Sequence, residues 1–510
     1  MDFLLLFGND FQVLIPELFI TLSICILLMY GVLNSTSFSA NFPILSRNVS
    51  WLCILTIGWS IYLMVNEGIF DFSGTSLYGL LKIDSWTQAT KLIVLTSALL
   101  SLLISLDYLK KEKLNDFEFS ILILLALLGM LFIISSHDLM SFYMAIELQS
   151  LSLYVLACFK RTSVLSVEAG LKYFILGAFS SGLLLFGISM IYGFSGATHF
   201  EDIAKLVSVT SMDDSFISSG GGIKVGLLFV CIGLLFKIYA VPFHQWVPDV
   251  YQGSPTIVTA FFATTPSLSV FALLVRVLHS TFYNLIIDWQ IILIICSVLS
   301  LIVGSLGALY QIKIKRFLAY SAISHVGYIL IALSTGSMEG VESLLFYIIV
   351  YILMSISFFS IIMSMRTIRR SSETYEVSYS EGEIENMDDF KGLGRIRPIY
   401  SFILAILLFS MAGIPPLAGF FSKLYIFISA IKEDLIYLVL IGILASVLGA
   451  VYYLKIIRWM YFSVPENWFS FDEISKERSY LISLAMCFVS FFFLYPNPIL
   501  LTIHKLSIII

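Results

Sequence analysis

Charged residues are scarce in this chain. They make up 12% of its 510 residues, whereas a soluble domain typically has about 25%. This composition excludes a soluble globular protein. In place of charges there are apolar runs of the roughly 17–25 residues that a helix needs to cross a bilayer. Because these runs are continuous and do not alternate, they predict helices and exclude a β-barrel.

Several functional motifs are also lacking. The six cysteines are scattered without a metal-binding spacing, which argues against a zinc site or an iron–sulfur cluster. Neither a dinucleotide-binding glycine motif nor a P-loop occurs. We therefore expect no metal, no bound nucleotide and no nucleic-acid partner. The first basic residue is Arg47, so we expect no cleaved leader and insertion through the first helix.

The apolar runs predict an all-α polytopic membrane protein with about fourteen transmembrane helices. In chain order we expect them near 13–33, 50–66, 88–108, 117–136, 138–159, 168–194, 223–263 (interrupted), 264–282, 288–310, 316–335, 340–364, 399–430 (interrupted), 434–458 and 477–497. About two thirds of the 29 basic residues lie on the odd-numbered connections. By the positive-inside rule these connections face the compartment of synthesis, and both termini lie on the opposite face.

Four ionisable residues lie far from the ends of these segments: Glu147, Lys237, His325 and Lys423. A charge at the centre of a bilayer costs about 2.5 kcal/mol or more, and such residues usually face a wet interior and have a function. We interpret three other basic residues differently, because long side chains near a helix end can reach the interface. These are Lys91, Lys172 and Arg276.

Both lysines lie beside prolines that interrupt their segments. Lys237 precedes Pro242 in "KIYAVPFHQWVPDVYQGSPT", and Lys423 follows Pro415 and Pro416 in "GIPPLAGFFSK". Proline removes a backbone hydrogen bond and breaks a helix. Two interrupted segments in corresponding places indicate a duplicated bundle with a transport site. A lysine beside unwound, hydrated backbone, with Glu147 to balance its charge, predicts a proton relay.

The histidines admit more than one interpretation. His325 can carry a proton, since imidazole titrates near neutral pH, or it can be a hydrogen-bonded packing residue. His244 lies at the first break and is an accessory candidate. Two histidines could also bind a haem, although nothing in the sequence pairs them.

Two polar connections stand out between the apolar runs. Residues 365–398 have an acidic middle flanked by basic residues, which favours a solvated, disordered loop over a docking surface. Residues 199–223 form the second connection, in which "SSGGG" predicts a flexible turn.

Several stretches resemble a known family. "MAIELQSLSLYVLACFKR", "FKIYAVPFHQWVPDVYQGSPT", "QIKIKRFLAYSAISHVGYILIAL" and "GIPPLAGFFSKLYIF" are similar to the chain 2 family of NADH–ubiquinone oxidoreductase, antiporter-like membrane subunits of respiratory complex I. The similarity extends from about residue 12 to the C-terminus. The stretch "GLKYFILGAFSSG" is similar in sequence to the mitochondrial members of the family. The resemblance therefore implies the mitochondrial inner membrane, with the basic face toward the matrix and both termini on the intermembrane-space side.

The resemblance also implies an architecture of two inverted five-helix repeats, each with a discontinuous helix. We expect an N-terminal three-helix segment at 1–116, the first repeat at 117–282, the second repeat at 283–460 with the polar matrix loop 365–398, and a C-terminal helix in 461–510.

The resemblance further implies a mid-membrane proton relay. In it Glu147 pairs with Lys237, His325 lies between the two halves, and Lys423 is the terminal lysine. This relay would be coupled to electron transfer from NADH to ubiquinone elsewhere in the complex. FMN, iron–sulfur clusters and ubiquinone are expected in other subunits, and no cofactor in this chain. The implied partners are neighbouring antiporter-like and small membrane-arm subunits and the bilayer, with cardiolipin among its lipids.

One position departs from the family pattern. Ser267, in "TTPSLSVFALL", stands where the family usually has a further lysine, so we expect His325 or water to carry protons past it. Two other functions stay open: a stand-alone cation/proton antiporter, and a non-pumping structural spacer of the membrane arm. We also predict that Glu147 and Lys237 interact directly or through one water.

Overall fold

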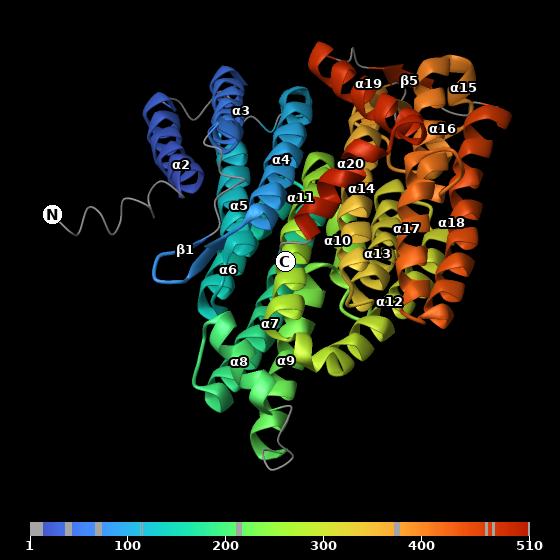
Figure 1. The fold of residues 1–510 in the computed structure, drawn as a ribbon. Helices are drawn as coiled ribbons and strands as arrows, with labels where there is room; N and C mark the ends of the chain where they lie inside the picture. Colours follow the sequence, from blue (N-terminus) through green and yellow to red (C-terminus); the bar gives the residue numbers. More distant parts are fainter. Residues whose placement is uncertain are drawn as a thin grey trace. The chain divides into compact units, whose positions relative to one another are not determined.

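The computed structural model describes residues 14–35, 43–66, 74–112, 114, 116–210, 217–371, 378–464, 468–471 and 475–507. Helices dominate these residues, which confirms the predicted all-α membrane fold (Figure 1). Twelve helices of the described residues are long and apolar enough to cross a membrane. The number fourteen and the inverted repeats stay predictions.

The chain divides into two compact units. The first comprises Met1–Tyr239, Gly253–Leu293 and Thr502–Ile510, and the second comprises Ala240–Gln252 and Ile294–Leu501. Helix α10 (Trp246–Gly253), helix α12 (Ile286–Leu309) and the C-terminal α20 (Asn497–Ser507) each include residues of both units.

The described part of the first unit has nine further α-helices and one hairpin. The helices are α2 (Ile15–Asn34), α3 (Pro43–Asn66), α4 (Ser85–Lys111), α5 (Glu118–Ser135), α6 (Leu139–Ala157), α7 (Val164–Ser195), α8 (Phe200–Thr210), α9 (Ile217–Lys237) and α11 (Thr256–Arg276). Strands β1 (Gly74–Ser76) and β2 (Leu81–Ile83) pair antiparallel, with Thr75 opposite Lys82. Helix α6 packs against α5 and α7, and α7 packs against α9.

The second unit contains α13 (Ile314–Ser334), α14 (Met338–Ile362), α15 (Leu393–Ile396), α16 (Pro398–Ala412), α17 (Ala418–Lys432), α18 (Ile436–Phe462) and α19 (Lys476–Phe491). Its strands are β3 (Met365–Ser371), β4 (Ser378–Glu383) and β5 (Trp468–Phe471). Strand β3 pairs antiparallel with both of the others. Helix α14 packs against α13, α16, α17 and α19.

Side-chain caps fix where several of these helices begin. Asp84 accepts a hydrogen bond from the Thr87 N–H while Thr87 accepts one from the Asp84 N–H, so the two form a capping box for α4. Asp138 caps α6 through the Met140 N–H at 2.8 Å. These caps supply acceptors for backbone N–H groups that the first turn of a helix leaves free.

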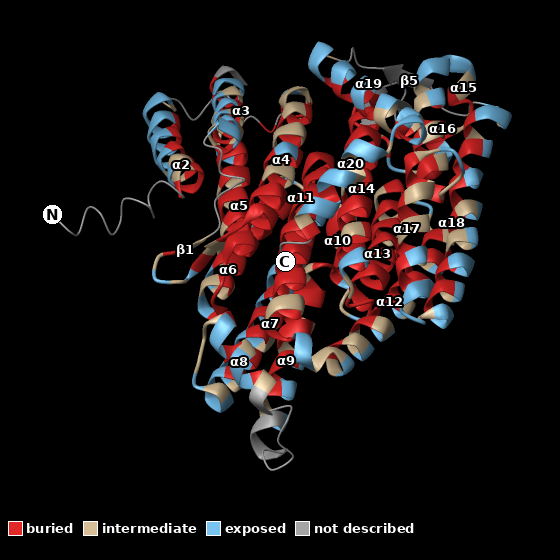
Figure 2. Ribbon diagram, in the orientation of Figure 1, coloured by how far each residue is buried: buried red, intermediate tan, exposed pale blue. Residues whose placement is uncertain are grey.

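Burial separates interior helices from peripheral ones within each unit (Figure 2). In the most apolar stretch of α11 every residue is buried, and α13 and α14 reach 94% and 89%, whereas α2 and α18 reach 39%. An all-round apolar helix can be buried in protein or face lipid. His325, in the middle of α13, therefore lies in a protein interior.

Both predicted interruptions are present. Helix α9 ends at Lys237 and α10 starts at Trp246, with Pro242 between them. Helix α16 ends at Ala412, and Gly413 follows with a left-handed φ of 89°. Pro415 and Pro416 then precede α17. Each break leaves helix-end carbonyl and N–H groups without partners in their own helix.

Several predicted boundaries were wrong. The segment 365–398, expected to be a disordered loop, contains β3, β4 and α15, and β3 gains a partner from the distant β5; residues 372–377 lie outside the described part. The "SSGGG" stretch lies inside α9 and not in a turn.

The helix predicted from residue 264 begins at Thr256, after Pro255, and includes Pro266. A proline inside a membrane helix is tolerated when neighbouring groups supply the lost partners. Residues 461–510 hold β5, α19 and α20, where one helix was expected.

Candidate functional site

Glu147 lies in the middle of α6 and is half-buried. Its Oε1 is buried and makes no hydrogen bond among the described residues. Its Oε2 lies 3.5 Å from the Ser150 hydroxyl, which also donates to the Glu147 carbonyl at 3.1 Å. A carboxylate with so few partners in an apolar helix is poorly compensated, so this position favours a group that exchanges protons.

Lys237, the last residue of α9, is held by a tyrosine of α6. Its Nζ donates to the Tyr154 hydroxyl at 3.3 Å and lies 5.7 Å from the centre of the Tyr154 ring. Within the described part of the chain, no carboxylate lies within the 4.0 Å of an ion pair with Lys237, although Glu147 is close enough to act on it electrostatically. The predicted interaction of the two residues, directly or through one water, stays a prediction, and a side chain of α6 contacts each of them.

Sequence reasoning did not identify those connecting side chains. Ser150 and Tyr154 follow Glu147 at i+3 and i+7 on α6, which places all three on one helix face. Ser150 and Tyr154 are four residues apart, so their side chains are neighbours on this face. The spacing of polar residues on the helix that carries Glu147 could have revealed them.

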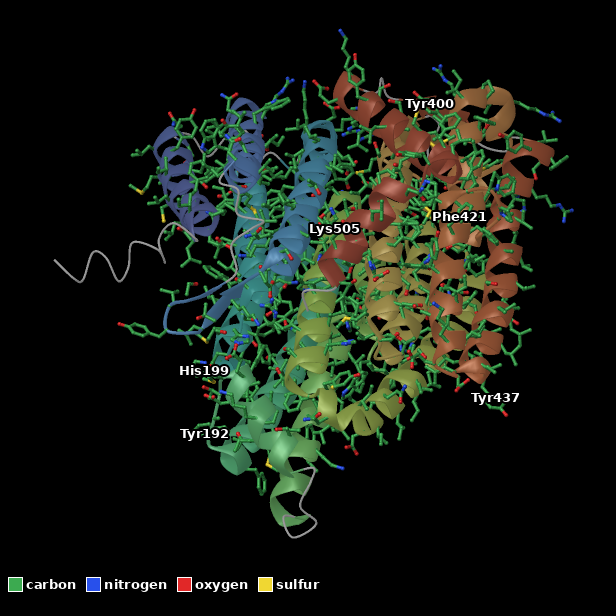
Figure 3. All side chains as sticks on the ribbon, in the orientation of Figure 1. Tyr192, His199, Tyr400, Phe421, Tyr437 and Lys505 are labelled. Carbon is green, nitrogen blue, oxygen red and sulfur yellow. The ribbon has the colours of Figure 1, made fainter. Side chains whose placement is uncertain are left out.

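Lys423 is buried on α17, two residues after Phe421, which Figure 3 labels. Its Nζ donates to the carbonyls of Met411 at 3.0 Å and Ala412 at 2.8 Å, the last residues of α16. Carbonyls at a helix C-terminus carry partial negative charge and favour a cation. The break therefore provides the ligands of this lysine.

The geometry around Lys423 requires a glycine at the start of the break. A Cβ at Gly413 would lie 3.0 Å from the Lys423 Cδ and 3.2 Å from its Nζ. The ring of Tyr328 completes the site, with its centre 5.0 Å from the Nζ. A cation facing an aromatic ring is stabilised by the ring quadrupole.

His325 is buried on α13 within a cluster of tyrosines. Its Nδ1 lies 2.6 Å from the Tyr347 hydroxyl and its Nε2 3.2 Å from that of Tyr453. Tyr453 also contacts the Ser321 hydroxyl at 2.5 Å. In a neutral imidazole one nitrogen donates and the other accepts, so both tyrosines are satisfied. Lys423 is close enough to act on His325 electrostatically.

The two accessory candidates lie in different surroundings. His244 lies in the first break, and its Nδ1 is buried without a hydrogen-bond partner among the described residues. Ser267 is buried in α11 and donates to the Thr264 carbonyl at 3.4 Å. Ser267 belongs to the first unit and His325 to the second, and the route predicted between them stays a prediction.

Two basic residues interpreted as reaching the interface are instead buried in ion pairs. The Lys91 Nζ lies 2.5 Å from the Glu17 carboxylate, and Arg276 donates to both oxygens of Asp84 at 2.9 and 2.7 Å. Lys172 pairs with Glu168 one turn earlier and is partly exposed, as expected near a helix end. Distance from a helix end therefore did not predict burial.

Comparison with known proteins decides the family. The model of "NADH:quinone oxidoreductase/Mrp antiporter, TM" matches residues 136–449. The chain belongs to this family. It is 45% identical to NADH-ubiquinone oxidoreductase chain 2 of Marchantia polymorpha, over 99% of both chains. It is also 39% identical to NADH-quinone oxidoreductase subunit N of Parvibaculum lavamentivorans, over 96% of both.

A solved structure agrees with this assignment. A chain of respiratory complex I from Thermus thermophilus with bound aureothin superposes with a TM-score of 0.76 at 26% identity, over 95% of this chain and 98% of that one. The predicted class, an antiporter-like membrane subunit of the complex I enzyme, is confirmed. Among the described residues no three His, Cys, Asp or Glu side chains form a metal-binding group.

Proposed function

We propose that this antiporter-like subunit carries protons through Glu147, Lys237, His325 and Lys423. The transfer is coupled to electron transfer from NADH to ubiquinone in other subunits. Support comes from the placement of a lysine at each helix break, where the helix ends leave backbone carbonyl and N–H groups without partners in their own helix. Pro242, Pro415 and Pro416 create these breaks.

The observation that carries the proposal is the set of ligands around Lys423. Its Nζ contacts two backbone carbonyls, which are neutral acceptors. When a lysine held by a carboxylate loses its proton, it leaves an uncompensated anion in a low-dielectric interior. A lysine held by carbonyls leaves none. Lys423 can therefore lose its proton without leaving an unpaired anion, and the carbonyl dipoles stabilise the ammonium when the proton is bound.

The other groups take complementary roles in this proposal. Lys237 and Glu147 exchange a proton in the first unit. His325 carries protons in the second unit toward Lys423, through hydroxyls that already contact its ring. His244 is an accessory group at the first break, and water carries protons past Ser267.

We place the chain with partners by analogy to its relatives. Its neighbours are other antiporter-like and small membrane-arm subunits of complex I, and its bilayer is the mitochondrial inner membrane with cardiolipin. The basic connections face the matrix, and both termini lie on the intermembrane-space side.

Substitution of Lys423 by Met tests the proposal in the complex reconstituted into vesicles. We expect the complex to assemble and proton pumping to fall about a hundredfold or more, within the range that one positioned proton-transfer group contributes. Lys432→Met is the matched control, because Lys432 lies on the same helix in an exposed pair with Glu339. Normal pumping by the Lys423 variant would contradict the proposal. Cation/proton exchange by the purified chain alone would favour a stand-alone antiporter.

A further inference from the structure

If Glu147 and Lys237 exchange a proton, a chain of hydrogen bonds must connect them. That exchange is part of the proposed function, on which this inference rests. No direct ion pair joins them among the described residues. A residue between them must then either pass the proton or hold a water that does. The structure offers one side chain that contacts the lysine directly, Tyr154.

The Tyr154 hydroxyl lies on a short route to the carboxylate. It accepts from the Lys237 Nζ at 3.3 Å, and Ser150 lies one helical turn before Tyr154 on the same face of α6. The Ser150 hydroxyl in turn lies 3.5 Å from the Glu147 Oε2. Tyrosine and serine hydroxyls both donate and accept hydrogen bonds, so each can pass on one proton while it receives another.

Helix α7 fixes the Tyr154 ring in this position. The Tyr173 ring packs edge-on against it, with centres 4.7 Å apart and planes at 88°, and Phe174 packs at 5.7 Å. Gly177 leaves the space that the hydroxyl occupies, because a Cβ there would overlap the Tyr154 oxygen. A hydroxyl held on three sides loses little freedom when it takes part in proton transfer.

We propose that Tyr154 is a proton-relay residue between Lys237 and Glu147, with Ser150 as the second link. The Lys237 ammonium gives a proton to the Tyr154 oxygen as Tyr154 gives its own to Ser150. Ser150 gives its proton to the Glu147 carboxylate. The products are a neutral amine and a neutral carboxylic acid, and both hydroxyls are regenerated. The reverse sequence restores the charged pair.

The test uses Tyr154→Phe in the assembled complex, reconstituted in vesicles. Phenylalanine keeps the ring packing and removes the hydroxyl. We expect normal assembly, proton pumping about a hundredfold slower, and a larger solvent deuterium isotope effect on coupled NADH oxidation. A packing role would not change the isotope effect. Tyr173→Phe is the control, since it removes a hydroxyl from the adjacent ring and leaves the Lys237 contact; we expect it to behave like the parent.

Gly177→Ala gives an independent test, because it displaces the Tyr154 hydroxyl without altering any polar residue. We expect the same change in isotope effect as in Tyr154→Phe. An unchanged isotope effect in both variants would overturn the inference, as would an equal loss of pumping in Tyr154→Phe and Tyr173→Phe.

Two further variants separate this inference from the proposed function. If Glu147→Gln and Lys237→Met both lose pumping while Tyr154→Phe keeps it, only the tyrosine relay is wrong. If both variants pump normally, the proposed function itself is wrong, and the relay with it.

Discussion

The two units hold their lysines at helix breaks by different means. In the first unit Lys237 contacts a tyrosine hydroxyl and lies within electrostatic reach of a carboxylate. In the second unit Lys423 contacts the carbonyl ends of a broken helix and faces an aromatic ring. In the first unit a carboxylate at a distance balances the charge of the lysine. In the second unit backbone dipoles in direct contact with the lysine do so.

This difference shows that the second break supplies backbone ligands to its lysine, whereas a side chain of α6 holds Lys237. Interaction with a full opposite charge falls with distance but remains strong in a low dielectric. Interaction with helix-end dipoles falls off within one turn. We therefore expect Lys237 to respond to changes at Glu147, and Lys423 to changes in the backbone around Gly413.

The largest expected effect concerns the buried ion pairs of the first unit, in which the two charged groups are in direct contact. Lys91→Met should lower the stability of the assembled complex by about 3–5 kcal/mol, because it leaves Glu17 buried and uncompensated. Thermal denaturation and the yield of assembled complex measure this. The double variant with Glu17→Gln removes both charges, and we expect it to recover most of the loss. A double variant as unstable as the single one would show that the lysine contributes packing and not charge compensation.

The second effect distinguishes the two interpretations of His325. His325→Gln keeps one donor and one acceptor for Tyr347 and Tyr453 but cannot titrate. We expect normal assembly with pumping reduced about a hundredfold, measured as protons moved per NADH oxidised. Tyr347→Phe is the companion variant, because it removes one of these hydrogen bonds and keeps the imidazole. Full pumping by His325→Gln would make the histidine a packing residue and weaken the contrast between the units.

Part of this comparison could be predicted from the sequence. Prolines and charges in apolar runs are local features, and they identified both breaks and the four ionisable residues of the proposed relay. The partners of those residues could not be predicted in the same way. Tyr154 reaches Lys237 only because Gly177 on another helix leaves room for it, and the ligands of Lys423 are backbone atoms, which no residue type identifies.

Two errors share this cause. Lys91 and Arg276 lie near helix ends, but tertiary packing covers them. The charged segment 365–398 resembles a disordered loop in composition, whereas β3 is stabilised by pairing with β5 about a hundred residues later. Pairing between strands that are far apart in the sequence cannot be predicted from the composition of one segment.

The smallest expected effect concerns His137, on the connection between α5 and α6. Burial, together with the nearby charges of Arg276 and Lys82, lowers the pKa of His137, and its contact with Glu201 at 3.3 Å opposes this only partly. The neighbouring His199 pairs with Asp138 and is labelled in Figure 3. A histidine whose pKa is lower in the folded state than its ordinary value near 6.5 favours the fold while both states are neutral.

That contribution is present above about pH 6.5 and is lost as the pH falls toward the lowered pKa, because the unfolded chain binds the proton first. The loss is at most about 1.4 kcal/mol per pH unit for one group. Thermal denaturation of the complex between pH 7 and 5 measures it. We expect His137→Asn to reduce the slope and Glu201→Gln to increase the loss, since the glutamate is the group that raises the pKa of His137. Equal slopes in all three proteins would show that the charges of the first unit do not reach this histidine.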